Sequence, residues 1–177
     1  MPLVNEKYTE IDIETWERRS IYEHFLNMED PYFGLVVPVD VTQCYQNAKA
    51  KKISFFTSYL HKCMLAINAT PAMRLRIIDN KPYDTNVVDC STTIFKRNKT
   101  FGMSYIEHTE DYQLFHERFL EEQARIEKSD QLLPNKEANQ HCIHCSALPW
   151  IKFIGHKEPR SGMAESIPKL GFSKTYE

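Results

Sequence analysis

Glycine is scarce in this chain, and its scarcity excludes two large classes of nucleotide-binding protein. Only 5 of the 177 residues are glycine, and neither G-x-x-x-x-G-K nor G-x-G-x-x-G occurs. Both motifs place glycines where the backbone must approach a phosphate closely. The motifs of a P-loop nucleotide hydrolase and of a Rossmann dinucleotide-binding protein are therefore excluded.

Long apolar runs, a basic bias and a cysteine framework are lacking as well. No window reaches the roughly 18 apolar residues of a membrane span, and the opening residues, MPLVNEKYTE, lack the pattern of a secretory signal. The net charge of -2 with interspersed signs argues against a nucleic-acid partner. The five cysteines are an odd number without framework spacing. We therefore expect reduced thiols, a cytoplasmic location and no membrane association.

The composition that is present is that of a soluble globular protein. Apolar residues make up 42% and charged residues 26% of the chain, and 177 residues suit a single domain over 1–177. Apolar periodicity and turn residues predict helices at 13–27, capped by Asp12, at 54–69 and at 111–128. They predict strands at 34–41, 72–78, 91–96, 100–107, 142–146, 150–154 and 167–172, with a turn at 79–82. This order predicts an α/β protein of the α+β type, with a mixed β-sheet and helices packed on it.

Two histidines and two cysteines stand close together in QHCIHCSALPW (140–150). On a strand, His141, Ile143 and Cys145 share one face, and Cys142, His144 and Ser146 share the other. A closed zinc site needs four ligands and one face offers at most two, so we expect core thiols and edge histidines, with no metal. A Cys142–His144 nucleophile pair lacks an orienting partner. Ser146, before the Pro-Trp step, either caps a turn or projects into a cleft.

The sequence resembles the trimeric chloramphenicol acetyltransferase family, which has the fold of the CoA-dependent acyltransferases, from about residue 7 onward. The segments that carry this resemblance are YTEIDIETWERR near the start, VDVT at 39–42, the FF…P…MRLRI pattern of 55–77, TTIF…KTF at 92–101, LLP at 132–134, SALPWIKF at 146–153 and SIPK at 166–169.

The resemblance implies transfer of an acetyl group from acetyl-CoA, as co-substrate, to the primary hydroxyl of chloramphenicol, which inactivates the antibiotic. It implies a homotrimer with active sites between subunits. A histidine in a near C-terminal H-H-x-x-x-D-G motif is the general base in the family. Ser146 matches the serine that donates a hydrogen bond to the oxyanion. Arg18 matches an arginine that pairs with the aspartate of the histidine motif.

The resemblance also implies a substrate pocket lined by Phe25, Phe33, Thr93, Phe101 and Leu133. His144, two residues before Ser146, is expected to be a wall of this pocket rather than a base. His156 stands where the family often has an aromatic residue. A more polar wall favours a different acceptor, so substrate identity stays open at this point.

The histidine motif itself does not occur in the 177 residues, because none of the seven histidines is followed by x-x-x-D-G. By the resemblance, the final strand, the histidine loop and the last helix would follow Glu177, and we expect these 177 residues alone to be a poor enzyme. Three alternatives remain: a catalytically inactive truncated homologue or small-molecule-binding protein of the same fold, an acetyltransferase for another small alcohol, and an acyltransferase like the core of the 2-oxoacid dehydrogenase complexes.

Overall fold

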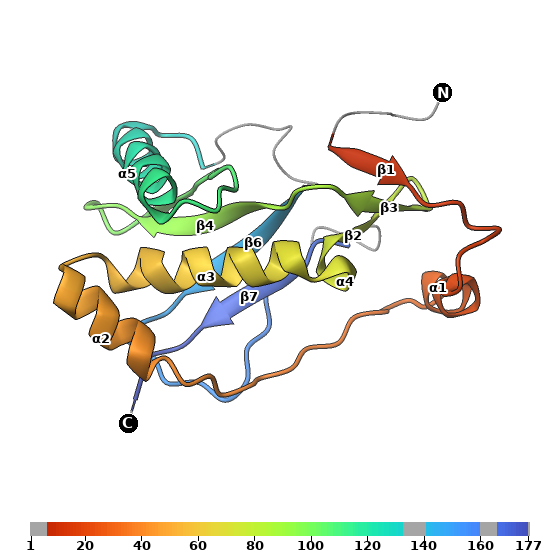
Figure 1. Cartoon of the computed structure of the whole chain (residues 1–177), viewed down its shortest axis with the longest axis horizontal. Helices are drawn as coiled ribbons and strands as arrows, with labels where there is room; N and C mark the ends of the chain where they lie inside the picture. The colour runs from red at the N-terminus through yellow and green to blue at the C-terminus, as the bar shows by residue number, and fades with distance from the viewer. Residues whose placement is uncertain (1–6, 133–140, 160–165, 177) are drawn as a thin grey trace.

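The computed structural model describes residues 7–132, 141–159 and 166–176, which form two β-sheets with helices packed against them (Figure 1). The smaller sheet is antiparallel and has the strand order β1-β3-β2, with β1 at Tyr8–Glu10, β2 at Leu75–Ile78 and β3 at Lys81–Thr85. The larger sheet is mixed and has the order β5-β4-β6-β7, with β4 at Asp89–Phe95, β5 at Phe101–Met103, β6 at Cys142–Ala147 and β7 at Lys169–Phe172. The predicted α/β class with a mixed sheet is confirmed.

Both predicted hairpins are present, and left-handed residues make their turns. Asp79 and Asn80 connect β2 and β3 with φ of 49° and 57°. Two successive positive φ angles match a type I′ turn, whose twist suits a two-residue hairpin and which favours Asp and Asn. Lys99, with φ of 67°, lies in the turn between β4 and β5.

The two long helices begin within one residue of their predicted starts, and each has a capping side chain. They are α3 at Phe55–Ala69 and α5 at Tyr112–Lys128. The Ser54 hydroxyl accepts a hydrogen bond from the Thr57 N–H at 3.3 Å, and the Asp111 carboxylate accepts one from the Leu114 N–H at 2.8 Å. Each side chain satisfies a backbone donor that the first helical turn leaves unpaired. Two shorter helices, α2 at Thr42–Lys51 and α4 at Pro71–Arg74, flank α3.

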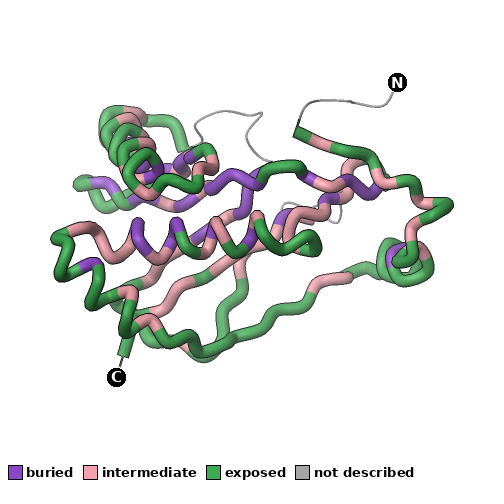
Figure 2. The backbone as a smooth tube through the Cα atoms, in the orientation of Figure 1, coloured by how far each residue is buried: buried purple, intermediate pink, exposed green. Residues whose placement is uncertain are grey.

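Helices α3 and α5 pack on one face of the larger sheet and form the core with it. The cluster joins side chains of α3, α5, β4 and β6 with Val88 and Ile106, and its fully covered members include Leu60, Met64, Cys90, Phe115, Ile126 and Ile143. Figure 2 shows the buried residues gathered along the sheet and its facing helices. The opposite face of the larger sheet does not contribute side chains to this cluster.

The helix predicted at 13–27 is shorter in the structure, and a different side of it is buried. The Asp12 carboxylate accepts hydrogen bonds from the Glu14 N–H at 3.0 Å and the Thr15 hydroxyl at 3.2 Å, so it closes a turn instead of capping a helix. Helix α1 begins later, at Arg19–Leu26. Its buried residue is Tyr22, whose hydroxyl donates to the Asn80 carbonyl at 2.8 Å. Ile21, Phe25 and Met28, whose spacing predicts a buried apolar side of the helix, are exposed.

The strands predicted at 34–41 and 150–154 do not form. Residues 33–39 run as an extended, mostly exposed segment between α1 and α2 (Figures 1 and 2), and no strand in the described ranges pairs with them. Pro38 lacks the N–H that a paired strand needs. At the second position a turn closes, with the Ile151 N–H donating to the Leu148 carbonyl at 3.0 Å. Strand propensity alone is not enough in either place, because a strand needs a paired neighbour: 33–39 has none among the described strands, and at 150–154 the Lys174 N–H donates to the Ile151 carbonyl at 2.8 Å without forming a ladder.

Candidate active site

Strand β6 presents its residues alternately to the core and to the uncovered face of the sheet. Ile143 and Cys145 belong to the core cluster, and His144 and Ser146 line a pocket on the other side. The pairing is parallel on both sides of the strand, with Ser91 of β4 opposite His144 and Gly171 of β7 opposite Ser146. The alternation expected for 141–146 therefore holds for these four residues.

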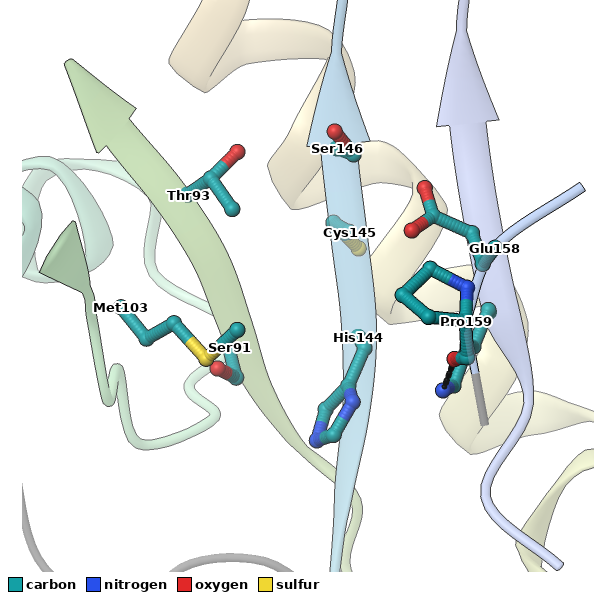
Figure 3. Close-up of a pocket in the computed structure, with 9 residues that line it drawn as sticks. Ser91, Thr93, Met103, His144, Cys145, Ser146, Glu158 and Pro159 are labelled. Carbon is teal, nitrogen blue, oxygen red and sulfur yellow. Dashed lines mark hydrogen bonds between the residues drawn. The ribbon is translucent and has the colours of Figure 1, made fainter. Parts of the chain in front are cut away.

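A pocket of about 80 Å³ lies over β4 and β6 on this face (Figure 3). Three hydroxyl side chains enter its lining from the strands: Ser91, Thr93 and Ser146. Within the described residues, none of the three hydroxyls has a hydrogen-bond partner, so each is free to bind a ligand. The remaining lining residues are Met103, His144, Cys145, Glu158, Pro159 and Lys169. Six of the nine lining residues carry polar or charged side chains, although most of the exposed lining surface is apolar.

The segment after Trp150 closes one side of the pocket. Glu158 Oε1 lies 3.4 Å from His156 Nε2, and the His156 ring packs on Phe153 with ring centroids 5.0 Å apart. The Lys169 ammonium donates to the Pro159 carbonyl, which ties this segment to β7. These contacts hold a carboxylate at the pocket wall beside Ser146.

The sites expected from the resemblance come together only in part. Ser146, Thr93 and His144 line the one pocket, and His156 adjoins it through Glu158. The three phenylalanines are not among its lining residues, and all are exposed: Phe25 on α1, Phe33 in the extended segment and Phe101 on β5. Arg18 is exposed where α1 begins. Leu133 lies outside the described residues.

Six further lining residues were not assigned to the site from the sequence: Ser91, Met103, Cys145, Glu158, Pro159 and Lys169. Ser91 could have been found, because it stands two residues before Thr93 on the same strand face. Met103 could have been found from the hairpin, since it pairs with Thr93. Glu158 and Lys169 gave no local signal, because their placement depends on the parallel pairing of β6 with β7.

We expected His141 at an edge of the sheet, but it lies in a separate buried cluster. Its Nε2 lies 3.1 Å from the Lys7 ammonium and 3.0 Å from the Tyr105 hydroxyl, and its Nδ1 lies 3.1 Å from the Tyr8 hydroxyl. The Tyr105 hydroxyl also donates to Asp89 at 2.6 Å. Burial, and then the nearby Lys7 charge, lower the pKa of His141.

A cysteine nucleophile is not supported at this strand. Cys142 is only 1% exposed, and burial, followed by the Asp89 charge, raises the pKa of its thiol to about 12. A thiol with such a pKa stays protonated at neutral pH and is inert. All five cysteines are free. Within residues 7–132, 141–159 and 166–176, no group of three or more His, Cys, Asp or Glu side chains could hold a metal ion. No helix in these ranges is long and apolar enough to cross a membrane.

Comparison with known proteins gives one consistent result. A family model described as chloramphenicol acetyltransferase matches residues 6–167. The chloramphenicol acetyltransferase of Staphylococcus aureus is 24% identical over 150 residues, covering 84% of this chain and 69% of that protein. The protein of the same name from Escherichia coli is 24% identical over 147 residues, covering 82% and 67%. A solved structure of a chloramphenicol acetyltransferase matches with a TM-score of 0.87 and 25% identity, covering 96% of this chain and 83% of that one.

The family match covers the smaller sheet, the five helices, β4 to β6 and Ser146, and the structural match covers 96% of the chain. The sequence resemblance is therefore confirmed: the chain belongs to the chloramphenicol acetyltransferase family.

Proposed function

We propose that this protein transfers an acetyl group from acetyl-CoA to the primary hydroxyl of chloramphenicol or of a related small alcohol. The observation that carries the proposal is the Ser146 hydroxyl. It lies near the end of β6, lines a pocket and has no hydrogen-bond partner within the described residues. It also begins the S-A-L-P-W sequence that the family resemblance assigns to oxyanion binding.

Ser146 would act on the charge that develops when an alcohol attacks a thioester. The carbonyl oxygen becomes negative in the transition state, and a fixed O–H donor stabilises that charge more than it stabilises the neutral carbonyl. The strand fixes the donor, because β6 is paired on both sides. Ser146 therefore needs little reorganisation when the charge forms.

The residues present fit the acyl part of acetyl-CoA. The partner-free hydroxyls of Ser146 and Thr93 are donors for a carbonyl oxygen. A cavity of about 80 Å³ holds the reacting groups, so the rest of coenzyme A would lie outside it. His144 would form part of the wall, and the general base would be the histidine of the family's H-x-x-x-D-G motif. That motif does not occur in these 177 residues.

The test measures acetyl transfer by release of free thiol, with acetyl-CoA and chloramphenicol as substrates. We expect Ser146→Ala to lower kcat by about 10²–10³, the usual loss for one oxyanion donor, with little change in KM. Ser20→Ala removes the same hydroxyl from the exposed side of α1 and serves as the matched control. An unchanged kcat in Ser146→Ala, or no turnover by the complete gene product, would overturn the proposal.

The assignment of the base needs its own comparison. The 177-residue polypeptide is assayed beside a chloramphenicol acetyltransferase that carries the histidine motif. Since a positioned base contributes about 10²–10⁴ in rate, equal turnover by the two would show that the histidine motif is not needed.

We also propose that the protein assembles as a homotrimer. The exposed apolar side chains of the extended segment support this, with Phe33, Leu35 and Val39 between 73% and 85% exposed. A contiguous apolar surface of this kind marks an interaction site. We expect Val37→Asp to lower the mass measured by sedimentation at micromolar concentration, and Gln43→Asp, on the exposed side of α2, to leave it unchanged. A wild-type mass of one chain would contradict the proposal.

A further inference from the structure

Among the described residues that line the pocket, Glu158 carries the one acidic group. Figure 3 shows its carboxylate between β6 and β7, pointing toward Ser146. Its side chain is 27% exposed, so it is partly shielded from water. One oxygen, Oε1, faces His156 at 3.4 Å, and the described residues provide no hydrogen bond to the other. An ionised carboxylate only accepts hydrogen bonds, so this oxygen can accept one from a donor group of a ligand.

His156 holds Glu158, and a glycine makes room for His156. A Cβ added at Gly171 would lie 2.1 Å from His156 Nδ1 and 2.8 Å from its Cε1, distances that real atoms do not reach. A side chain at position 171 would therefore displace the imidazole. Gly171 is opposite Ser146 in the parallel pairing, and opposite residues of neighbouring strands face the same side about 4.8 Å apart. The imidazole thus stands in the place of a side chain next to Ser146.

The chemistry of this arrangement differs from that of an aromatic pocket. Glu158 offers an acceptor, and the hydroxyls of Ser91 and Thr93 offer donors and acceptors without partners in the described chain. The Lys169 ammonium, which also lines the pocket, donates one hydrogen bond to the Pro159 carbonyl. A ligand group that donates hydrogen bonds complements these side chains, whereas an apolar group would leave the carboxylate unpaired, which is costly.

We propose that Glu158, positioned by His156 in the space over Gly171, determines the acceptor, and that the preferred acceptor is an alcohol with an amine or a second hydroxyl beside the reacting hydroxyl. This inference rests on the proposed acetyl transfer. His156 acts through Glu158 and is a positioning residue.

The experiment compares three matched alcohols: 3-phenylpropan-1-ol, 2-amino-3-phenylpropan-1-ol and 3-phenylpropane-1,2-diol. Equilibrium binding to the complete protein is measured by calorimetry without acetyl-CoA, and kcat/KM for acetyl transfer is measured separately. A hydrogen bond to a charged group predicts that the amine and the diol bind about tenfold or more tightly than the mono-alcohol.

Three variants locate the preference. Glu158→Gln keeps the shape but removes the charge, so the preference for the amine falls more than that for the diol. His156→Phe releases Glu158, and Gly171→Ala displaces the imidazole, so each lowers the binding of the amine and of the diol relative to that of the mono-alcohol. Gly155→Ala is the matched control, because a Cβ there meets no atom within 4 Å. A merely structural role would weaken binding of all three alcohols equally.

Each outcome separates the inference from the function on which it rests. Equal binding of the three alcohols, binding of none, or an unchanged preference in Glu158→Gln would overturn the inference. A clear binding preference without turnover of any alcohol or of chloramphenicol would leave the pocket chemistry standing and overturn the acetyltransferase proposal.

Discussion

The strand β4 and the segment from Phe33 to Val39 are similar in sequence but different in structure. Both are rich in β-branched and aromatic residues, as in DCSTTIF and FGLVVPV. In β4, hydrogen-bonded neighbours lie on both sides and Cys90 and Ile94 enter the core. In the segment, Val36 and Val37 are 53% and 67% exposed, and no strand of the described chain pairs with it. Strand propensity thus needs a partner before it becomes structure.

The same contrast separates the expected site residues. Thr93, His144 and Ser146 come from the paired strands and line one pocket. Phe25 and Phe33 come from α1 and the extended segment, and both are exposed outside that pocket. Hydrogen bonds between paired strands fix the relative positions of their side chains. The side chains of an unpaired segment are fixed only if another surface packs on them. Mutations that treat the two regions alike should therefore have unequal effects.

The largest difference is expected for truncation of apolar side chains. Ile143→Ala removes a side chain that is 0% exposed in β6, and the lost burial plus the resulting cavity should lower the free energy of unfolding by about 2–5 kcal/mol. Leu35→Ala removes a side chain that is 79% exposed, and its effect should stay within about 0.5 kcal/mol. Denaturant unfolding at concentrations where the protein is a single chain measures both. Equal losses would show that the segment packs in the free chain.

Apolar periodicity and turn residues predicted the two long helices and the first hairpin turn, and local hydrogen bonds hold their ends in the structure. Ser54 and Asp111 cap α3 and α5 through bonds three residues away, and Asp79-Asn80 turns the chain within one hairpin. Asp12 made the same kind of bond but closed a turn, because the residues after it do not continue as a helix. A capping residue therefore indicates a helix start only when the following face can be buried.

Some residues of the candidate site could not be predicted from such local signals. Ser146 and Thr93 were expected from the family resemblance, and alternation along β6 predicted that Ser146 and His144 share a face. Glu158 was missed because its neighbours depend on the parallel register of β6 with β7. That register is a long-range property, set by how the strands pack on the core, and no nearby residue specifies it.

A smaller difference is expected when the two regions each receive one methyl group. A Cβ at Gly102 of β5 would lie 2.7 Å from Ile126, which is 0% exposed and cannot move away freely. Gly102→Ala should therefore destabilise the protein by about 1–3 kcal/mol through overpacking. A Cβ at Gly34 meets nothing within 4 Å, so Gly34→Ala should be neutral or stabilise by about 0.4–1 kcal/mol. The melting temperatures of the two variants measure both changes in stability. Destabilisation by Gly34→Ala would show that the segment makes a contact at this position.

The smallest effect is expected from histidines of the two regions as pH changes. Burial and Lys7 lower the pKa of His141, and its unfolded value is near 6.5. Above about pH 6.5 both states are neutral at this ring and its contribution to stability is complete. As pH falls below 6.5 the unfolded chain takes up a proton before the native state does, so stability decreases toward the lower native pKa. A separation of one pKa unit corresponds to about 1.4 kcal/mol.

We measure the change in unfolding free energy between pH 7.5 and pH 5.5. A variant loses hydrogen bonds equally at both pH values, so that loss drops out of the difference. His141→Gln keeps a polar side chain beside Tyr8 and Tyr105 but cannot titrate, so its stability should fall less over this range than that of the wild type. His24→Gln, on the exposed side of α1, is the matched control and should follow the wild type. If His141→Gln instead keeps the full wild-type slope, the buried cluster does not discriminate against the charged imidazole. The difference between the paired sheet and the N-terminal region would then be one of packing alone.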